Sequence, residues 1–563
     1  MNIEIEVNGK PIRSRRGEMI LDALKENGIH IPTLCSIQGY RPTGSCRLCV
    51  VEIEGKKELV PACSYPVEEW MRIKTHSSRV IQARKTILEL LLAGHPNDCL
   101  CCGQSGGCGL QELAAEMSIC ERRFSGNLVR YKTDNSSPAL LHDPSKCVLC
   151  GRCIRICEEE QSVCALDFMY RGDRTRVATL LSKGINSSAC IQCGQCIQVC
   201  PTGALQESGT LDEAIHSFSD AETFHVAIVD PAIAASFGEF YGMRGGKDVL
   251  PQISSALRKI GFSRIYDGSW ATSLEAHHLS QFMRKTPRSE RKPMVLGSCP
   301  AIRKFIEKQF PHFLDHLSPV IPGRYLLAKW IRTLVACGEA ATPGRISITY
   351  FSPCTAFKHE SNLTVFRADD LLVDHVLSGH ELFRWIRLFG LRFDELTPET
   401  PDGINLKLSM GGNLSASAGG FLEHFLANQD ALPINAVERN DQFSKLRGPR
   451  LVKEITFPNH EGSLHCQAIS QTANFRTLMG EWQNKVEMPD WIEVMACIYG
   501  CLGGAGIPPV TSEKLIRTRM KAVYDAAESN RNRPVALDPS LPVIPDWDLE
   551  SVSLKHSPPQ TAL

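Results

Sequence analysis

The chain opens with a period of two in its apolar positions. Residues 3–7 alternate Ile, Ile and Val with charged side chains, and Asn8-Gly9 follows directly. Such alternation indicates a half-buried strand, and Asn-Gly is the preferred centre of a tight hairpin turn. A helix is expected over 21–26, and residues 53–60 form a strand–turn–strand pattern. Residues 1–78 therefore predict a small β-rich domain.

Helical and buried-strand patterns follow. Residues 79–125 place apolar residues at helical spacing, and the polar stretch 131–141 is typical of a linker. Beyond about residue 218, short apolar runs alternate with helical segments, at 226–230, 264–267, 293–298 and 346–352. This alternation predicts parallel α/β units. The proline-containing segment 531–563 is predicted to be an extended tail.

Composition narrows the class of protein. The 563 residues are 43% hydrophobic and 22% charged, as in an ordinary soluble protein of several domains. Lys plus Arg and Asp plus Glu both number 62, so no net field favours nucleic acid or an anionic membrane. The apolar runs are too short to cross a bilayer, and the start lacks the apolar core of a secretory signal. We expect a cytoplasmic protein without a membrane span.

The 24 cysteines carry most of the chemical information. They cluster at short intervals, which suits metal thiolates in a reducing compartment better than long-range disulfides. The first group is Cys35, Cys46, Cys49 and Cys63. A close triplet with a distant fourth thiolate is typical of a plant-type [2Fe–2S] centre, whereas a zinc ribbon has two separated Cys-x2-Cys pairs.

The second group combines three thiols with one imidazole, from His95, Cys99, Cys102 and Cys108. Spacing alone fits a [4Fe–4S] cube and a Cys3His zinc site equally well. Cys101 lies beside this group as a spare thiol.

The strongest signal is the run Cys-x2-Cys-x2-Cys-x3-Cys, which occurs twice. It is the pattern of two-cluster bacterial ferredoxins, in which the fourth cysteine of each run ligates the other cluster. One cube is therefore assigned to Cys147, Cys150, Cys153 and Cys200. The other is assigned to Cys190, Cys193, Cys196 and Cys157.

Three later motifs resemble the active-site loops of [FeFe]-hydrogenases. They are Gly297-Ser298-Cys299-Pro300, the segment 352–360 that begins Ser-Pro-Cys-Thr, and the segment 493–508 with two cysteines and a glycine-rich end. Their order after the ferredoxin repeat extends the resemblance over residues 1–530. The first two cysteine groups also resemble those of this family and of the complex I family. This resemblance implies that the His95 group holds a [4Fe–4S] cube.

The resemblance also implies a fifth cluster, a [4Fe–4S] cube ligated by Cys299, Cys354, Cys497 and Cys501. In active family members the counterpart of Cys501 also bridges to a diiron unit that carries CO, cyanide and an amine dithiolate. Hydrogen is made or split on that unit.

Five residues around these loops depart from the family pattern. Ser298 stands where the family has a proton-delivering cysteine, Ser352 where it has a methionine, and Phe357 where a lysine pairs with iron-bound cyanide. Ile507 interrupts the usual Gly-Gly-Gly-Gln-Pro ending, and Ala232 replaces a serine. Together these changes predict an altered pocket from which the diiron unit has been lost.

Physical chemistry supports that expectation. Burying an anionic cyanide without a hydrogen-bond donor costs several kcal/mol, and Phe357 offers none. Lys358 comes one position late and is expected to point elsewhere. A serine hydroxyl has a far higher pKa than a thiol, which titrates at about 8.5, so it relays protons poorly at neutral pH.

The predicted fold is multidomain, α+β and α/β. A β-grasp ferredoxin domain (1–78) is followed by a His/Cys cluster domain (79–125) and a two-[4Fe–4S] ferredoxin domain (135–212). A two-lobed α/β hydrogenase-like domain (218–530) and the tail (531–563) complete it. The expected cofactors are one [2Fe–2S] cluster and four [4Fe–4S] clusters, three of the latter in the N-terminal part.

The predicted function is electron transfer within a cytoplasmic oxidoreductase complex linked to NAD(P)H or ferredoxin, without independent hydrogenase activity. The sequence has no flavin, NAD or molybdopterin motif, so substrate chemistry is expected from partners. The candidates are a flavin-containing NAD(P)H-oxidising subunit, a small [2Fe–2S] subunit, ferredoxin and a formate dehydrogenase catalytic subunit. The alternatives are an active or sensory [FeFe]-hydrogenase with an altered proton relay, and a cluster-assembly scaffold.

Overall fold

The computed structural model describes residues 2–531 apart from 127, 288–289, 298, 335–344, 367–372, 404–410, 429–441, 460–461 and 485–486. The chain forms two compact units. The first comprises Met1–Glu159, Cys164–Cys190 and Gln195–Glu207, and the second comprises Glu160–Val163, Ile191–Gly194 and Ser208–Leu563. Beyond Arg531, the predicted tail lies outside the described residues.

A five-stranded mixed sheet forms the start of the first unit, in the order β2-β1-β5-β3-β4. The strands are β1 (Asn2–Val7), β2 (Lys10–Arg15), β3 (Val50–Ile53), β4 (Val60–Pro61) and β5 (Arg72–Lys74). Strands β1 and β2 pair antiparallel around Asn8 and Gly9, which both have positive φ. The buried apolar face of β1 shares a core with helix α1 (Ile20–Glu26). The predicted hairpin and helix are confirmed.

Helices and short strand pairs make up the rest of this unit. The helices are α2 (Ser78–Ala93), which Ser77 caps by accepting from the Val80 N–H, α3 (Gly109–Glu116), α4 (Arg152–Arg155) and α5 (Gln195–Val199). Strand β6 (Leu140–His142) pairs with β9 (Leu205–Glu207), and β7 (Asp167–Met169) pairs with β8 (Arg176–Ala178).

The linker predicted at 131–141 differs in part from the structure, because its last residues belong to β6. The backbone of Asp134 exchanges two hydrogen bonds with that of His142, at 2.8 and 2.9 Å. The Ser137 hydroxyl accepts from the Ala139 N–H at 3.0 Å. The polar side chains of this stretch therefore satisfy a folded backbone.

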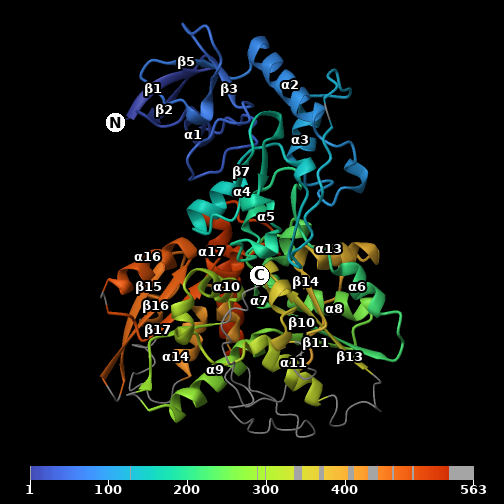
Figure 1. Cartoon of the computed structure of the whole chain (residues 1–563), viewed down its shortest axis with the longest axis vertical. Coiled ribbons are helices and arrows are strands. Elements are labelled where there is room, and N and C mark those ends of the chain that lie inside the picture. The colour runs from blue at the N-terminus through green and yellow to red at the C-terminus, as the bar shows by residue number, and fades with distance from the viewer. Residues whose placement is uncertain are drawn as a thin grey trace. The chain divides into compact units, whose positions relative to one another are not determined.

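Two four-stranded sheets organise the described part of the second unit (Figure 1). One is wholly parallel, in the order β11-β10-β13-β14. Its strands are β10 (Thr223–Val229), β11 (Arg264–Asp267), β13 (Arg345–Ser352) and β14 (His375–Ser378). The other has the order β12-β17-β16-β15, and only the pair β15–β16 is antiparallel. Its strands are β12 (Met294–Leu296), β15 (Val452–Asn459), β16 (Gly462–Ser470) and β17 (Trp491–Met495).

Helices pack around the sheets, and the parallel strands β10, β12, β13 and β17 are mostly buried, whereas β15 alternates exposed and buried residues. The helices are α6 (Leu211–Ser217), α7 (Pro231–Ser236), α8 (Leu250–Ile260), α9 (Ser269–Lys285), α10 (Pro300–Gln309), α11 (Gly323–Leu334), α12 (Thr355–Glu360), α13 (Gly379–Leu388), α14 (Gly420–Ala427), α16 (Thr472–Gln483) and α17 (Glu513–Arg531). The four predicted buried strands and the parallel α/β organisation are confirmed. In the part of the chain that the structure describes, no helix is long and apolar enough to span a membrane.

A buried ion pair joins helices α12 and α13. Lys358 Nζ lies 2.7 Å from Glu381 Oε2, and each side chain is only 2% exposed. Glu381 also accepts from the backbone N–H of Ser378 and of Thr210. Lys358 therefore points away from the cysteine loop that precedes it, as the sequence predicted.

We predict that Lys358→Met lowers the free energy of unfolding by about 3–5 kcal/mol, because it leaves the Glu381 carboxylate buried without its cation. Urea titration followed by tryptophan fluorescence measures this change. The matched control is Arg517→Gln, which removes an exposed pair with Glu513 and is expected to change stability by less than about 0.5 kcal/mol. Equal effects of the two variants on the free energy of unfolding would contradict the conclusion that Lys358 and Glu381 form a stabilising buried pair.

Candidate functional site

Four cysteines of the second unit lie just beyond the carboxyl ends of parallel strands. Cys299 follows β12, Cys354 follows β13, and Cys497 follows β17. Cys501 lies one turn further, in the short helix η15 (Gly500–Gly503). Strands β12 and β17 are parallel neighbours in one sheet, so their carboxyl ends lie together, and β13 belongs to the other sheet. The cysteine loops of both sheets meet at one cavity although they lie far apart in sequence.

The four cysteines surround a cavity of about 110 Å³. A buried water needs roughly 10–15 Å³ by this kind of measure, so the cavity admits a group much larger than one water. Burial is the main cause that raises the pKa of the Cys354 thiol to about 12, and it raises the pKa of Cys497 and Cys501 strongly. The charges of Cys299, Cys354 and Cys501 add to the shift at Cys497. Four thiols around one cavity fit a [4Fe–4S] cube, whose irons would stabilise their ionised form.

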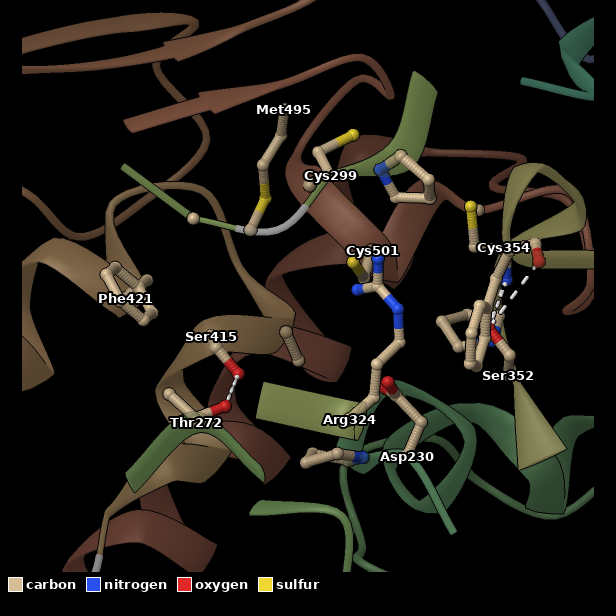
Figure 2. Close-up of a pocket in the computed structure, with 18 of the residues that line it drawn as sticks. Asp230, Thr272, Cys299, Arg324, Ser352, Cys354, Ser415, Phe421, Met495 and Cys501 are labelled. Carbon is tan, nitrogen blue, oxygen red and sulfur yellow. Dashed lines mark hydrogen bonds between the residues drawn. The ribbon is translucent and has the colours of Figure 1, made fainter. Parts of the chain in front are cut away.

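Arg324 brings a cation into the same cavity, from the first turn of α11. Figure 2 shows its side chain extending toward Cys501. Its positive charge lowers the pKa of Cys299, Cys354 and Cys501, in each case against the larger opposing effect of burial. No motif around the cysteines indicated this residue.

Glu360, at the end of α12, holds the guanidinium of Arg324. Arg324 Nε donates to Glu360 Oε2 at 3.0 Å, and its Nη2 contacts the same oxygen. The two side chains are 10% and 4% exposed. The Tyr325 hydroxyl also donates to Glu360 Oε2, at 3.1 Å, and Arg303 Nε lies 3.9 Å from Glu360 Oε1.

Phe357 provides a packing surface for Arg324. The guanidinium carbon of Arg324 lies 4.7 Å from the centroid of the Phe357 ring, a cation–π distance. The sequence correctly indicated that Phe357 offers no donor. It did not reveal that a cation from another helix stacks on that ring.

A close helix contact sets the position of Arg324. A side chain at Gly323 would meet the Ala271 carbonyl oxygen of α9 at 1.8 Å, so only glycine allows α11 to begin here. Glu275 of α9 accepts from the Gly323 N–H at 2.8 Å and also lines the cavity. Glu275 is a second charged residue of the cavity wall.

A carboxylate faces the cavity from the end of β10. Asp230 caps α7 by accepting from the Ala232 N–H at 2.8 Å, and it accepts from the Tyr350 hydroxyl at 3.4 Å. Burial is the main cause that raises the pKa of Asp230 to about 6, so it is largely ionised at neutral pH.

Two of the five altered residues are on the cavity wall. Ser352 and Phe357 line it, and the Ser352 hydroxyl accepts from the Cys354 N–H at 3.1 Å (Figure 2). Ala232 and Ile507 are buried in apolar clusters, and Cys501 packs against the cluster that holds Ala232. Ser298 lies outside the described residues.

The first N-terminal group brings four buried thiols together. Cys63 is in hydrogen-bonding contact with Cys35 and Cys49, which raises its pKa, and Cys46 contacts Cys35. The Leu34 N–H also donates to Cys46 Sγ, at 3.4 Å. Thiols in mutual contact and an amide directed at sulfur fit a small cluster such as [2Fe–2S].

His95 presents a nitrogen without a partner. Its Nδ1 donates to the Pro96 carbonyl oxygen at 3.1 Å, whereas its buried Nε2 has no hydrogen-bond partner. Burial lowers the pKa of this imidazole, so the ring is neutral at pH 7. A neutral, oriented ring with an unpaired Nε2 fits a metal ligand. The charges of Cys99 and Cys102 also act on Cys108, which places these thiols near one another.

Four cysteines of the ferredoxin repeat lie close together within the first unit. Burial raises the pKa of Cys153, and the charges of Cys147, Cys150 and Cys200 add to the shift. These are the four cysteines assigned to one cube. Burial likewise raises the pKa of Cys157 to about 11, with a contribution from Cys190. Cys193 belongs to the second unit, where its charge acts on Cys497.

Comparison with known proteins identifies the family. Residues 223–505 match the iron only hydrogenase large subunit, C-terminal domain. The chain belongs to the iron-only hydrogenase large-subunit family. Ahead of that domain, the match continues with a 2Fe-2S iron-sulfur cluster binding domain over 1–78 and the NADH-ubiquinone oxidoreductase-G iron-sulfur binding region over 84–123. The NADH-quinone oxidoreductase subunit 3 ferredoxin-like domain matches 137–206.

Two relatives extend over nearly the whole of this iron-only hydrogenase family member. The NADP-reducing hydrogenase subunit HndD of Solidesulfovibrio fructosivorans is 31% identical over 536 residues, covering 93% of this chain and 92% of its own. Iron hydrogenase 1 of Clostridium pasteurianum is 27% identical over 534 residues, covering 94% and 92%. The NADPH-Fe(3+) oxidoreductase subunit alpha of Geobacter sulfurreducens is 35% identical over 184 residues, covering 33% of this chain and 22% of its own.

We predict that Cys102→Ser removes about four iron atoms per chain, because a cube needs all its ligands. Iron analysis of anaerobically reconstituted protein measures the loss. The neighbouring Cys101, an exposed thiol, supplies the control, and Cys101→Ser is expected to keep full iron content. Zinc in place of iron, or equal iron in both variants, would show that the His95 site is not a cube.

Proposed function

We propose that this chain is an iron–sulfur electron-transfer subunit of a cytoplasmic NAD(P)H-linked oxidoreductase complex. In this proposal its hydrogenase-like domain holds a [4Fe–4S] cube on Cys299, Cys354, Cys497 and Cys501, without a diiron unit. The clusters supply one-electron transfer. The chain's own residues hold them in series and shield the last one from solvent.

The charges beside Cys501 carry this proposal. Arg324 extends toward Cys501 (Figure 2) and is paired with Glu360, so any further group bound at Cys501 would share the cavity with this ion pair. Displacing Arg324 would separate it from Glu360. Leaving Glu360 buried and unpaired costs about 3–5 kcal/mol. Asp230 adds a carboxylate to the same cavity, which repels an anionic, cyanide-bearing group. These charges support a cube without the diiron unit.

Hydrogen bonds between two cysteine loops support the series arrangement. The Thr355 hydroxyl, next to Cys354, donates to the Gln192 carbonyl oxygen, next to Cys193, at 2.9 Å. A side chain at Gly194 would meet Thr355 Oγ1 at 2.4 Å, so glycine is required for this approach. The Gln161 amide donates to the carbonyl oxygen of Ala496, beside Cys497, at 3.1 Å. The Cys193 loop thus packs directly on the loops that would hold the last cube.

The relatives indicate the class of partner. HndD is a subunit of an NADP-reducing hydrogenase, and the Geobacter relative is a subunit of an NADPH-Fe(3+) oxidoreductase. By analogy, this chain would exchange electrons with a flavin-containing NAD(P)H-oxidising subunit and a small [2Fe–2S] subunit. Ferredoxin and a formate dehydrogenase catalytic subunit are the candidates for the other end of the series.

A second candidate function is hydrogen turnover in an altered pocket. It is favoured by Arg324 and Glu275, which bring a cation and a carboxylate to the cavity wall. A cyanide-bearing unit requires a cation, and a proton relay requires a titratable group. The same experiment separates the two functions.

We predict that the chain, matured together with the diiron-assembly machinery, shows no infrared bands of metal-bound CO or cyanide. It should contain about 18 iron atoms per chain, the sum for one [2Fe–2S] and four [4Fe–4S] clusters. An active [FeFe]-hydrogenase matured in parallel is the positive control. CO and cyanide bands together with hydrogen evolution would establish the second function instead.

A further inference from the structure

Arg324 is held in a fixed, buried position beside the predicted last cube. Glu360 binds its Nε and Nη2, the Phe357 ring stacks on its guanidinium carbon, and Gly323 anchors its helix against α9. A guanidinium fixed at three points, with a side chain 10% exposed, cannot turn into solvent without breaking these contacts. Its charge is therefore weakly screened at the cavity.

Arg324 shares one cavity with the four thiols that would ligate the cube, and its side chain extends toward Cys501 (Figure 2). A reduced cube carries one more negative charge than an oxidised cube, spread over its irons and sulfurs. A buried cation this close to the ligands favours the added electron.

Other charged groups are close, and their roles differ. The carboxylate of Asp230 opposes Arg324, because its negative charge disfavours further negative charge at Cys501. Glu360 is paired with Arg324 and contacts Arg303, and Glu275 accepts from the Gly323 amide. Among these groups, Arg324 is the cation that extends toward Cys501 (Figure 2).

We propose that Arg324 sets the reduction potential of the cube on Cys299, Cys354, Cys497 and Cys501 by stabilising its reduced state. Position 357, where the family pattern has lysine, is Phe357 here, and the cation comes from α11 in the same cavity. This inference rests on the proposed function, because it takes the cube to be the last electron carrier of the chain.

The test is an EPR-monitored redox titration of the full-length holoprotein and its variants. The signal of the cube is identified by its absence from Cys354→Ser. In Arg324→Gln we expect the ratio of reduced to oxidised cube at a fixed potential to fall roughly a hundredfold. At about 59 mV per tenfold change for one electron, this shifts the midpoint by about 120 mV to the negative side.

Two variants separate charge from structure. Arg324→Lys keeps the charge and is expected to keep the ratio within about threefold of the wild-type value. Arg517→Gln removes an exposed arginine of the same unit and should leave the ratio unchanged. If Arg324→Gln does not load the cube, Arg324→Gln with Glu360→Gln removes both charges of the pair. That double variant is expected to shift in the same direction as Arg324→Gln.

The proposal is overturned if a cube-loaded Arg324→Gln, or the double variant, titrates like the wild type. It is also overturned if Arg324→Lys shifts as far as Arg324→Gln, because charge would then not be the cause. Either result leaves the electron-transfer function intact. The electron-transfer function is contradicted by a different result, the appearance of CO and cyanide infrared bands in the wild-type protein.

Discussion

The main physical constraint on this cavity is that negative charge on its cysteines, including Cys501, must be buried and compensated. Four thiols meet in one cavity, and burial alone would keep them protonated. Iron stabilises their thiolate form, and a nearby cation stabilises the additional charge of a reduced cube. The Arg324–Glu360 pair supplies that cation in a form that can be buried, because each charge compensates the other.

The strand topology explains how residues far apart in the sequence meet at one cavity. The parallel strands β10, β12, β13 and β17 end near the same cavity, so each contributes a polar group or cysteine just after its last residue. Helices packed at these ends bring in the remaining groups. Arg324 enters from the start of α11, which requires glycine at position 323. The residues that line the cavity therefore come mainly from loops and helix ends, which the sheets position.

The sequence was most informative where the physical constraint is local. Cysteine intervals indicate cluster classes because ligands on one loop must match one cluster, and the Asn8-Gly9 turn requires two residues with positive φ. Buried strands were also predictable, since both faces of the sheet are covered and the runs are continuously apolar. The sequence also predicted that Lys358 points away from the cysteine loop, because it comes one position after the lysine of the family pattern.

Residues selected by tertiary packing could not be predicted. Arg324 lies in no motif, and the contact of α9 with α11 brings it to the cavity. Ala232 and Ile507 occupy motif positions, yet their side chains face apolar cores. A motif gives a position in the chain and does not give the direction of a side chain. The loss of a lysine at position 357 therefore did not mean the loss of positive charge from the cavity.

A cryo-EM structure of the anaerobically reconstituted protein, matured together with the diiron-assembly machinery, tests the central claim most directly. The account predicts density for a cube on Cys299, Cys354, Cys497 and Cys501, with Arg324 still paired to Glu360 and no metal density beyond Cys501. Density for two further irons attached to Cys501, with Arg324 displaced from the cavity, would contradict it.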